Sequence, residues 1–215
     1  MAYYVVVGLG RFGHYLSLTL AERGADVVVI DKDVNAVEAI KDRVFQAGIG
    51  DGTSRNVLEN LGVANAEAVV VALGPKMEES LLTVHNLKEI GVKRIVAKAN
   101  SDAHGKILEA LGADEIVFAE KETAVRVGHR LGNRNLLDFL PLNDRYSIRE
   151  IVVPEHFIGK SLRELDLRSR FEVNVIAIKR MEEILFPGGE SLLNSNDHLV
   201  VLGSEKALNR LTPQE

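Results

Sequence analysis

The chain has 215 residues, of which 46% are hydrophobic and 27% are charged, and its formal net charge is −5 at pH 7. This composition is typical of a soluble globular protein with one or two domains, and the negative charge disfavours a protein that binds nucleic acid or anionic membranes. The sequence contains no cysteine, which excludes disulfides, a thiolate nucleophile and a cysteine-bound metal.

The amino terminus does not have the pattern of a signal peptide. Met1–Tyr4 contains no basic residue, and the apolar run Val5–Val7 ends at Gly8. No apolar run approaches the ~18 residues that a membrane-spanning helix needs. We therefore expect a cytoplasmic protein that associates with a membrane only peripherally, through a partner.

Short apolar runs alternate with amphipathic stretches from the amino terminus to Leu131. Strands are expected at 3–7, 26–30, 44–47, 68–72, 94–98 and 115–118. Helices are expected at 12–23, 34–42, 54–61, 78–89, 103–111 and 121–131. Regular alternation of strand and helix predicts an α/β fold, a Rossmann-like doubly wound parallel sheet with strand order 3-2-1-4-5-6.

The pattern changes after Leu131. Asn133–Asn135 indicates a break, and Leu136–Leu142 is a short, strongly apolar segment. Four strands then follow at 147–153, 173–179, 184–186 and 198–202, with short helices at 161–165 and 205–211. We predict a Rossmann domain at 1–132, a linker at 133–143 and a small β-rich α+β domain at 144–215. A domain this small has a thin core and often depends on a partner surface.

A glycine-rich turn follows the first strand, in the sequence VVVGLGRFG. Its residues are Gly8, Leu9, Gly10, Arg11, Phe12 and Gly13. The first glycine of such a turn allows a tight bend, the second lets the backbone approach a phosphate, and the third lets helix and strand pack closely. The following helix offers free N–H groups to the phosphates. The pattern therefore predicts a nucleotide site, with incidental glycines in an ordinary βα unit as the alternative.

An acidic residue, Asp31, ends the second strand and is followed by Lys32. A carboxylate at this place accepts hydrogen bonds from ribose hydroxyls and repels a 2′-phosphate, which disfavours NADP, although Lys32 leaves that choice open. Arg11 lies inside the turn and is either a phosphate contact or a solvated surface side chain.

Other polar groups lie at the ends of the remaining strands, where open α/β sheets bind ligands. Each of them is a candidate ligand contact or a helix cap. The residues concerned are Asp51 and Gly52 after the third strand, Ala72, Leu73 and Gly74 after the fourth, Lys98 and Ala99 after the fifth, and Glu120 after the sixth.

We find no catalytic pattern beside this site. The sequence has no Tyr-x-x-x-Lys pair, no Gly-x-Ser-x-Gly turn, no His-Glu-x-x-His and no Walker Gly-Lys-Ser/Thr, and its six histidines are scattered. A nucleotide site without nearby acid–base groups is typical of a sensor and not of an enzyme.

The chain resembles the RCK (or KTN) family, the cytosolic gating subunits of potassium uptake systems of the TrkA and KtrA type. The likeness is carried by VGLGRFG at 7–13, Asp31, GDGT at 50–53, KEIGVKRIVAKANS at 88–101, ILEALGADEIVFAEKE at 107–122, the long segment 146–180 and NDHLVVLG at 196–203. These segments extend over both predicted domains and are closest to KtrA-type members. Gly52 takes the place of a usual alanine, and Ala119 that of a usual proline.

The resemblance implies a ligand and its contacts. The first domain would bind ATP or ADP, or NAD(H) as in TrkA-like members, with Gly8, Gly10 and Gly13 at the phosphates and Asp31 at the ribose. Arg11 would contact terminal phosphates, including those of a neighbouring subunit's ligand. Asp51, Ala72–Gly74 and Lys98–Ala99 would line the site. Glu120 would lie near the phosphates and a divalent cation, Mg²⁺ or Ca²⁺.

The resemblance also implies a second ligand and an assembly. The small domain would bind cyclic di-AMP through Arg168, Asn174, Ile176 and Pro187, although many such domains have no known ligand. Homodimers would form an octameric ring that contacts a membrane subunit of the KtrB or TrkH type. Leu136–Leu142 would dock onto the partner subunit, or else pack on its own chain. Exchange of ATP and ADP would then change the ring and control potassium flux.

Three alternatives stay open. The first is an NAD(H)-binding regulator of the TrkA type, and the second is an NAD-dependent oxidoreductase that takes its catalytic group from a partner. The third is a transcriptional redox sensor, which the negative charge and the lack of a visible DNA-binding motif disfavour.

Overall fold

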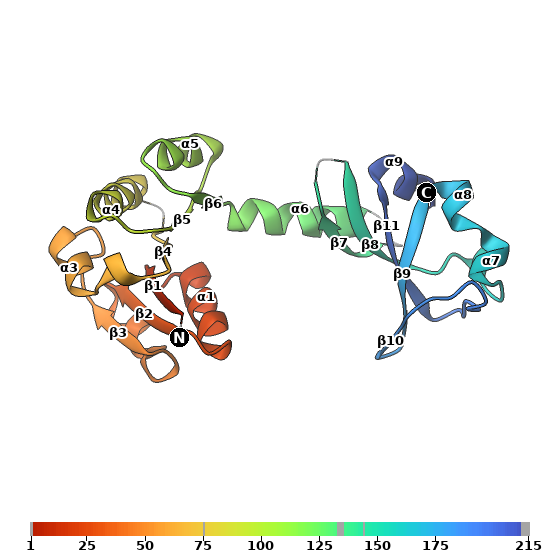
Figure 1. Ribbon diagram of the computed structural model, residues 1–215, viewed down its shortest axis with the longest axis horizontal. Helices are drawn as coiled ribbons and strands as arrows, with labels where there is room; N and C mark the ends of the chain where they lie inside the picture. Colours follow the sequence, from red (N-terminus) through yellow and green to blue (C-terminus); the bar gives the residue numbers. More distant parts are fainter. Residues whose placement is uncertain (1, 75, 133–135, 144, 212–215) are drawn as a thin grey trace. The chain divides into compact units, whose positions relative to one another are not determined.

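The computed structural model describes residues 2–74, 76–132, 136–143 and 145–211. The chain divides into two compact units, one up to Lys121 and one from Glu122 onward. Figure 1 colours the first unit from red to green and the second from green to blue. Within the described residues, no helix is both long enough and apolar enough to cross a membrane. The expected break at Asn133–Asn135 lies outside the described residues.

The first unit contains one six-stranded sheet in which every neighbouring pair of strands is parallel. Its strands are β1 Tyr3–Val7, β2 Asp26–Asp31, β3 Gln46–Ile49, β4 Ala68–Val71, β5 Ile95–Lys98 and β6 Glu115–Val117. Their order is β3-β2-β1-β4-β5-β6, which confirms the predicted doubly wound sheet.

Helices follow the strands of this sheet. They are α1 Arg11–Glu22, α2 Val34–Glu38, α3 Arg55–Asn60, α4 Met77–Ile90, α5 Asp102–Ala110 and α6 Ala119–Gly132. Two short 3₁₀ segments, Lys41–Arg43 and Val63–Asn65, lie between them. The contact boundary between the units falls within α6, earlier than the expected domain end at residue 132.

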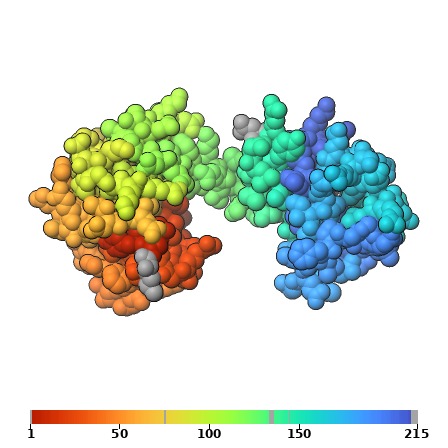
Figure 2. Space-filling model, in the orientation of Figure 1, coloured from red at the N-terminus to blue at the C-terminus, as the bar shows by residue number. Residues whose placement is uncertain are grey.

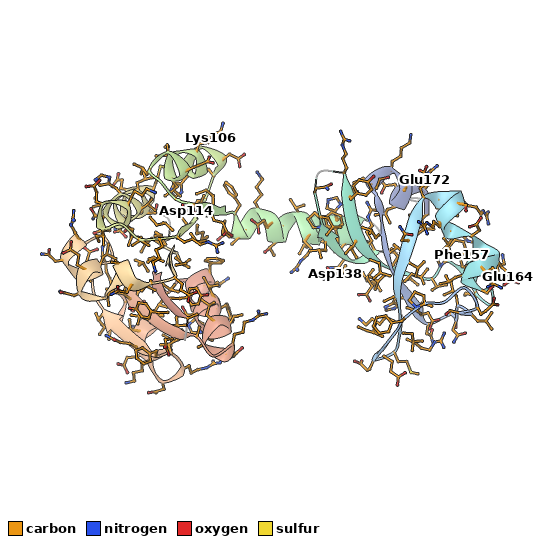
Figure 3. The ribbon with its side chains drawn as sticks, viewed as in Figure 1. Lys106, Asp114, Asp138, Phe157, Glu164 and Glu172 are labelled. Atoms are coloured by element: carbon orange, nitrogen blue, oxygen red, sulfur yellow. The ribbon has the colours of Figure 1, made fainter. Side chains whose placement is uncertain are left out.

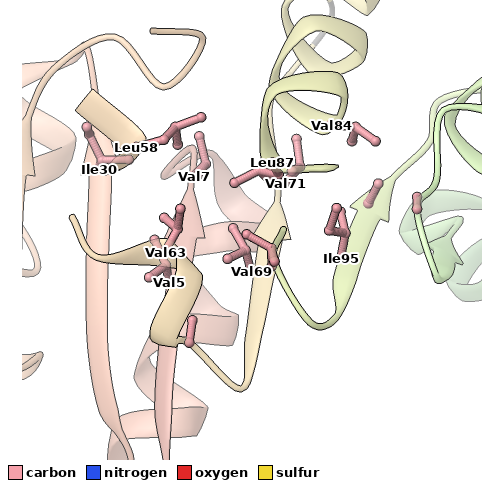
Figure 4. Close-up of a cluster of buried hydrophobic side chains, with 14 of the residues drawn as sticks. Val5, Val7, Ile30, Leu58, Val63, Val69, Val71, Val84, Leu87 and Ile95 are labelled. Carbon is pink, nitrogen blue, oxygen red and sulfur yellow. The ribbon is translucent and has the colours of Figure 1, made fainter. Parts of the chain in front are cut away.

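Two hydrophobic clusters lie on the two faces of the sheet. Val5 and Val7 of β1 belong to one cluster, which includes Leu58 of α3 and Leu87 of α4 (Figure 4). Val6 between them belongs to the other, with Leu18 of α1 and Val37 of α2. Successive strand residues point to opposite faces, so both faces of β1 are buried. This explains why its sequence is an uninterrupted apolar run and not an alternating one.

Two elements of the first unit differ most from the sequence expectation. The expected helix 34–42 ends at Glu38, and the chain then turns into the 3₁₀ segment, with Ile40 almost fully buried between them. The third strand lies two residues later than expected, because its pairing with β2 joins Gln46 to Val28 and Ile49 to Asp31. Pairing with a neighbour sets the bounds of an edge strand, and a local apolar run does not reveal that pairing.

The second unit contains an antiparallel five-stranded sheet of order β10-β9-β11-β8-β7. Its elements are β7 Leu136–Pro141, β8 Tyr146–Val152, the 3₁₀ segment Glu155–Phe157, α7 Leu162–Leu165, α8 Leu167–Phe171, β9 Val173–Arg180, β10 Glu183–Leu185, β11 Asp197–Ser204 and α9 Glu205–Leu211. This sheet with its short helices confirms a small β-rich second lobe.

The apolar segment Leu136–Leu142 is not a linker over most of its length. Leu136–Pro141 forms β7, which pairs with β8 at the edge of the sheet, and Leu136 and Phe139 are buried in the core of this unit. Leu136 and Phe139 therefore pack on their own chain, whereas Leu140 and Leu142 are exposed, and docking of the segment onto a partner subunit stays a prediction. The register of this pair shifts between Leu136 and Asp138, the latter labelled in Figure 3.

The core of the second unit lies against the short helices. Phe157 and Leu199 are buried there with Leu208 of α9. The helix α7 begins with a capping box in which Ser161 and Glu164, the latter labelled in Figure 3, each satisfy a backbone N–H of the other. Side chains fill the space around the ribbon of each unit, as the space-filling view shows (Figure 2). Core packing and helix capping therefore both stabilise this small lobe.

Candidate functional site

A cavity lies at the carboxyl ends of the central strands of the first unit. Its lining residues come from the ends of β1 to β4 and from the start of α4: Val7, Gly8, Gly10, Ile30, Asp31, Lys32, Gly50, Asp51, Gly52, Thr53, Ala72, Leu73, Gly74 and Glu79. The chain winds outward from β1 in both directions, to β2 on one side and to β4 on the other. Such a switch point is where doubly wound sheets bind their ligands.

The glycine turn is shaped by contacts that no side chain would allow. Gly8 has φ +100°, and a Cβ atom there would lie 2.8 Å from the carbonyl oxygen of Ala72. A Cβ atom on Gly13 would lie 1.9 Å from the carbonyl oxygen of Gly8. A Cβ atom on Gly10 would meet nothing within 4 Å, so the space above the middle of the turn is open. That open space lies over backbone, as close approach of a phosphate requires.

The helix α1 begins at this turn with Gly10 as its N-cap. Among the described residues, no side chain accepts from its first N–H groups, and its first turn contains no acidic residue. The first intrahelical bond runs from His14 N to Gly10 O over 2.9 Å. The N–H groups of the first turn therefore keep their donor capacity, and the helix dipole adds partial positive charge, which together favour an anion.

The carboxylate of Asp31 is fixed beside the turn by two backbone donors. Leu9 N donates to Oδ2, and Asp33 N donates to Oδ1 over 2.9 Å. A carboxylate has about four acceptor positions, so two remain for hydroxyl groups of a ligand. Leu9 itself is buried, and its part in the site is to position this carboxylate through its N–H group.

Three charged side chains meet at the mouth of the cavity. Lys32 Nζ lies 3.2 Å from Asp51 Oδ1 and 3.3 Å from Glu79 Oε1. Asp51 also accepts from the N–H and hydroxyl groups of Thr53, and these bonds are the main cause that lowers the pKa of Asp51. Hydrogen bonds to Asp51 and Glu79 raise the pKa of Lys32. Asp51 and Lys32 are thus both charged at neutral pH.

Glu79 was missed in the sequence analysis. It lies in the first turn of α4, and it lines the cavity because α4 follows the end of β4 directly. An acidic residue in the first turn of a helix after a central strand was the available signal. Thr83 and Asn86 of the same helix donate to the carbonyl oxygens of Gly52 and Thr53, which holds α4 against the β3–α3 loop.

The structure also shows why glycine fits at position 52. A Cβ atom there would lie 2.2 Å from Cγ1 of Val7, whose side chain is fully buried. Val7 ends β1 directly below the cavity, so the valine and the glycine fill one space together. In this chain the alanine usual at that position would require Val7 to move.

The structure brings together around the cavity most of the residues expected there. Gly8, Gly10, Asp31, Lys32, Asp51, Gly52, Ala72, Leu73 and Gly74 line it. Leu9, Arg11, Phe12 and Gly13 belong to the adjacent turn and do not line the cavity. The side chain of Arg11 is exposed, and Gly13 packs against the turn. Their contacts with a ligand stay predictions.

Lys98, Ala99 and Glu120 lie apart from this cavity. Lys98 Nζ pairs with Glu120 Oε1 over 2.5 Å, which lowers the pKa of Glu120. A second cavity is lined by Ala99, Asn100, Ser101, Asp102, Phe118, Glu120 and Lys121. Among the described residues, no group of three or more His, Cys, Asp or Glu side chains could hold a metal ion. Glu120 as a ligand of a divalent cation stays a prediction.

Comparison with known proteins assigns both units. A family model described as the TrkA-N domain matches residues 4–119, and one described as the TrkA-C domain matches residues 148–214. The chain belongs to the TrkA/KtrA (RCK) family. The first unit is thus its TrkA-N domain and the second contains its TrkA-C domain.

Curated relatives match the RCK chain over nearly its whole length. It is 38% identical to Ktr system potassium uptake protein C of Bacillus subtilis (strain 168), over 96% of this chain and 94% of that protein. It is 35% identical to Ktr system potassium uptake protein A of the same organism, with the same coverage. It is 30% identical to the protein A of Vibrio alginolyticus, over 97% and 96% of the two chains.

Solved structures share the fold. The RCK domain of GsuK superposes with a TM-score of 0.70 at 21% identity, covering 99% of this chain and 47% of that one. The GsuK channel bound to NAD gives the same TM-score and identity, with 39% of that chain covered. At this level of identity the likeness establishes the fold, and the RCK arrangement of a Rossmann lobe and a second lobe is confirmed.

The TrkA-C domain has a groove of its own between α7, α8 and β9. It is lined by Leu162, Arg163, Asp166, Leu167, Arg168, Val173, Asn174, Val175, Pro187, Gly188 and Gly189. Arg168, Asn174 and Pro187, three of the four residues expected at a second ligand, are thus brought together. Ile176 is exposed on β9 and does not line the groove.

Proposed function

We propose that this RCK protein is the nucleotide-binding regulatory subunit of a potassium uptake system, and that its ligand is ATP or ADP. The observation that supports the nucleotide is one arrangement in the TrkA-N domain. An uncapped helix N-terminus and an open glycine turn face a cavity whose other wall presents the fixed carboxylate of Asp31. Anion donors at one side and a ribose acceptor at the other are the two halves of an adenine nucleotide site.

Each part of the site has a role in this proposal. The N–H groups at the start of α1 bind phosphate oxygens, and Gly10 leaves room for them. Asp31 accepts from ribose hydroxyl groups with the lone pairs that its two backbone donors leave free. The guanidinium group of Arg11, exposed at the first position of α1, contacts the terminal phosphate of its own or a neighbouring subunit's ligand. The bound nucleotide supplies charge and contacts but undergoes no reaction.

The relatives' names connect the site to transport. The relatives at 38%, 35% and 30% identity are Ktr system potassium uptake proteins. We infer that this chain acts in the cytoplasm as a homodimer in an octameric ring, on a membrane potassium channel or transporter subunit. Exchange of ATP and ADP shifts the ring between two conformations. A ligand shifts such an equilibrium only by its difference in affinity for the two states.

NAD(H) is the second candidate ligand. It has an adenosine diphosphate half that would use the same turn and the same carboxylate. The GsuK channel, which shares the fold, has been solved with NAD. An NAD(H)-binding regulator differs from the first proposal in that its ligand has no terminal phosphate for Arg11 to distinguish.

Titration calorimetry with ATP, ADP and NADH tests this proposal on the full chain and on Arg11→Ala. We expect ATP and ADP to bind tightly and Arg11→Ala to weaken ATP at least about tenfold more than ADP, since a charge-assisted contact contributes ~1.5–3 kcal/mol. Arg23→Ala is the matched control, because Arg23 is exposed at the other end of α1. Tight NADH binding that Arg11→Ala does not weaken would support the NAD(H)-binding regulator. Absence of binding by every adenine nucleotide would refute the proposed site.

A second ligand, cyclic di-AMP, is proposed for the groove of the TrkA-C domain. Arg168 would bind a phosphate there, and Pro187 would pack on a base, with Asn174 nearby on β9. Calorimetry with cyclic di-AMP on the full chain and on Arg168→Ala tests this, with Arg170→Ala as the control because Arg170 does not line the groove. Binding that Arg168→Ala does not weaken would refute the assignment.

A further inference from the structure

The side chain of Lys32 raises a question that the acidic end of β2 does not answer. Lys32 directly follows Asp31 and lines the mouth of the cavity. In doubly wound folds, the acid at the end of the second strand selects a free ribose 2′-hydroxyl, whereas a cation close to it accommodates a 2′-phosphate. This chain has both groups side by side, so the two residues alone predict opposite preferences.

The contacts of Lys32 decide between these preferences. Its ammonium group lies 3.2 Å from the carboxylate of Asp51 and 3.3 Å from that of Glu79. Asp51 comes from the loop after β3 and Glu79 from α4, so two separate elements hold the lysine. The ammonium group of Lys32 is therefore already paired with two carboxylates, and it is not a free cation to which a 2′-phosphate could bind.

The charges at the mouth point the same way. Glu79 Oε1 also lies 3.4 Å from Nζ of the exposed Lys76. The group thus contains three carboxylates, those of Asp31, Asp51 and Glu79, and two ammonium groups. Its net charge is negative. A ribose 2′-phosphate, which has a charge of about −1.5 to −2, would meet repulsion there.

We propose that Asp51 and Glu79 are specificity-determining residues that hold Lys32 and close the site to nucleotides with a 2′-phosphate. The inference rests on the proposed adenine nucleotide site and adds the class of ligand, namely adenine nucleotides with a free 2′-hydroxyl group. Asp31 accepts the hydrogen bonds of the ribose hydroxyl groups. Asp51 and Glu79 pair with Lys32 and so prevent it from favouring a 2′-phosphate over a free 2′-hydroxyl.

The size of the effect follows from the exposure of these groups. The side chains of Lys32 and Asp51 are 50% and 47% exposed, so solvent screens their charges. At such sites one unit charge near a doubly charged phosphate changes affinity by roughly tenfold at low salt. The preference is the ratio of the affinity for a nucleotide with a free 2′-hydroxyl to that for its 2′-phosphate. Neutralising one carboxylate should therefore lower this ratio about tenfold, and neutralising both should lower it by up to about a hundredfold.

The test uses two pairs of probes that differ only in the 2′-phosphate: AMP with adenosine 2′,5′-bisphosphate, and NADH with NADPH. Their affinities are measured for the wild-type chain, Asp51→Asn, Glu79→Gln and the double variant, at low and at high salt. Asparagine keeps the oxygen acceptor for Thr53, and a thermal melt verifies folding of each variant. Glu79→Gln leaves that loop contact untouched and provides a second, independent variant.

We expect the wild-type chain to bind the nucleotide with a free 2′-hydroxyl more tightly in each pair of probes. This preference should be smaller in each single variant and smallest in the double variant. The difference between the variants and the wild-type chain should shrink at high salt. Adding Lys32→Ala to the double variant should reverse the part of the gained affinity for the 2′-phosphate that comes from the released lysine, and leave the part that comes from the lost carboxylate charges. Glu78→Gln is the matched control, since Glu78 precedes Glu79 in the same helix turn and does not line the cavity. It should leave the preference unchanged.

The outcomes separate this inference from the proposed function. If the free-hydroxyl nucleotides bind but the double variant keeps the full preference, or if Glu78→Gln changes it equally, then Asp51 and Glu79 do not set specificity and only this inference fails. If no adenine nucleotide binds the wild-type chain, the proposed function fails and this inference with it.

Discussion

The replacement Gly52→Ala is a sharp test of the packing beneath the cavity. The new Cβ atom would lie 2.2 Å from Cγ1 of Val7, well inside the distance at which two carbon atoms touch. Val7 is fully buried in the core of the first unit. The clash must be relieved by an unfavourable rotamer of Val7 or by a shift of the loop.

The expected cost is that of overpacking a filled core, about 1–3 kcal/mol. For a chain of this size each kcal/mol lowers the melting temperature by roughly 2–4 °C. Val7→Ala alone should cost about 1.5–3 kcal/mol through lost burial and a cavity. In the double variant, the methyl group introduced at position 52 occupies space that the valine has left. The two costs should therefore not add, and we expect a favourable coupling of about 1–2 kcal/mol.

Urea unfolding of the two single variants and the double variant measures this coupling. Gly74→Ala is the control, because Gly74 lines the same cavity but its Cβ atom would meet nothing within 4 Å. We expect it to change stability by less than about 0.5 kcal/mol. The reasoning would be refuted if Gly52→Ala had the same urea unfolding midpoint as the wild-type chain. It would also be refuted if the free-energy costs of Gly52→Ala and Val7→Ala added strictly in the double variant.

Two further predictions concern stability away from the site. The buried carboxylate of Asp197 accepts two bonds of 2.8 Å from Arg180, which lower its pKa, so its contribution is present above about pH 4 and is lost as pH falls through the lowered pKa. Asp197→Asn should cost about 1.5–3 kcal/mol near pH 7, the range for hydrogen bonds to a charged group, because Arg180 is 34% exposed and keeps access to water. It should also remove this acid-side slope, measured by urea unfolding from pH 7 to pH 2. Leu87→Ala should cost about 2–5 kcal/mol in the fully buried core of the first unit, whereas Leu82→Ala, at a residue 48% exposed on the same helix, should cost clearly less in the same assay.

The sheet of the first unit could be predicted from sequence because its signal is local and repeated. Each strand is an apolar run followed by an amphipathic helix. The crossover from one parallel strand to the next is almost always right-handed, and this rule determines where the next strand lies. The strand β7 could not be predicted in this way. Its residues Leu136–Pro141 have the same apolar character whether they pair with β8 or with another chain. Only the long-range register of the antiparallel sheet distinguishes the two.

The residues around the glycine turn could be predicted because the strands of a parallel sheet end at one edge. Asp31, Asp51 and Gly74 line the cavity because β2, β3 and β4 end at that edge near the turn. Lys98 ends β5, and Glu120 follows β6 in the first turn of α6; neither lines this cavity. The rule that strand ends bind ligands therefore predicted the right edge of the sheet, and the ligand contacts of Lys98 and Glu120 stay predictions.

The two ends of the cavity have separable roles in the proposed mechanism. ATP and ADP have the same ribose, so Asp31 and the carboxylates that hold Lys32 meet the same groups in both ligands. These residues select which nucleotides bind but cannot provide a difference between the two. The difference can come only from the phosphate end, where the start of α1 and Arg11 are exposed.

A conformational change driven by ligand exchange is limited by that difference, at about 1.4 kcal/mol for each tenfold ratio of affinities. Changes at the ribose end should therefore alter the preference for a free 2′-hydroxyl while leaving the ATP to ADP ratio constant. Arg11→Ala should alter that ratio and leave the 2′ preference constant. A variant at one end that changes both quantities would show that the ends are coupled, and that specificity and gating are not encoded by separate residues.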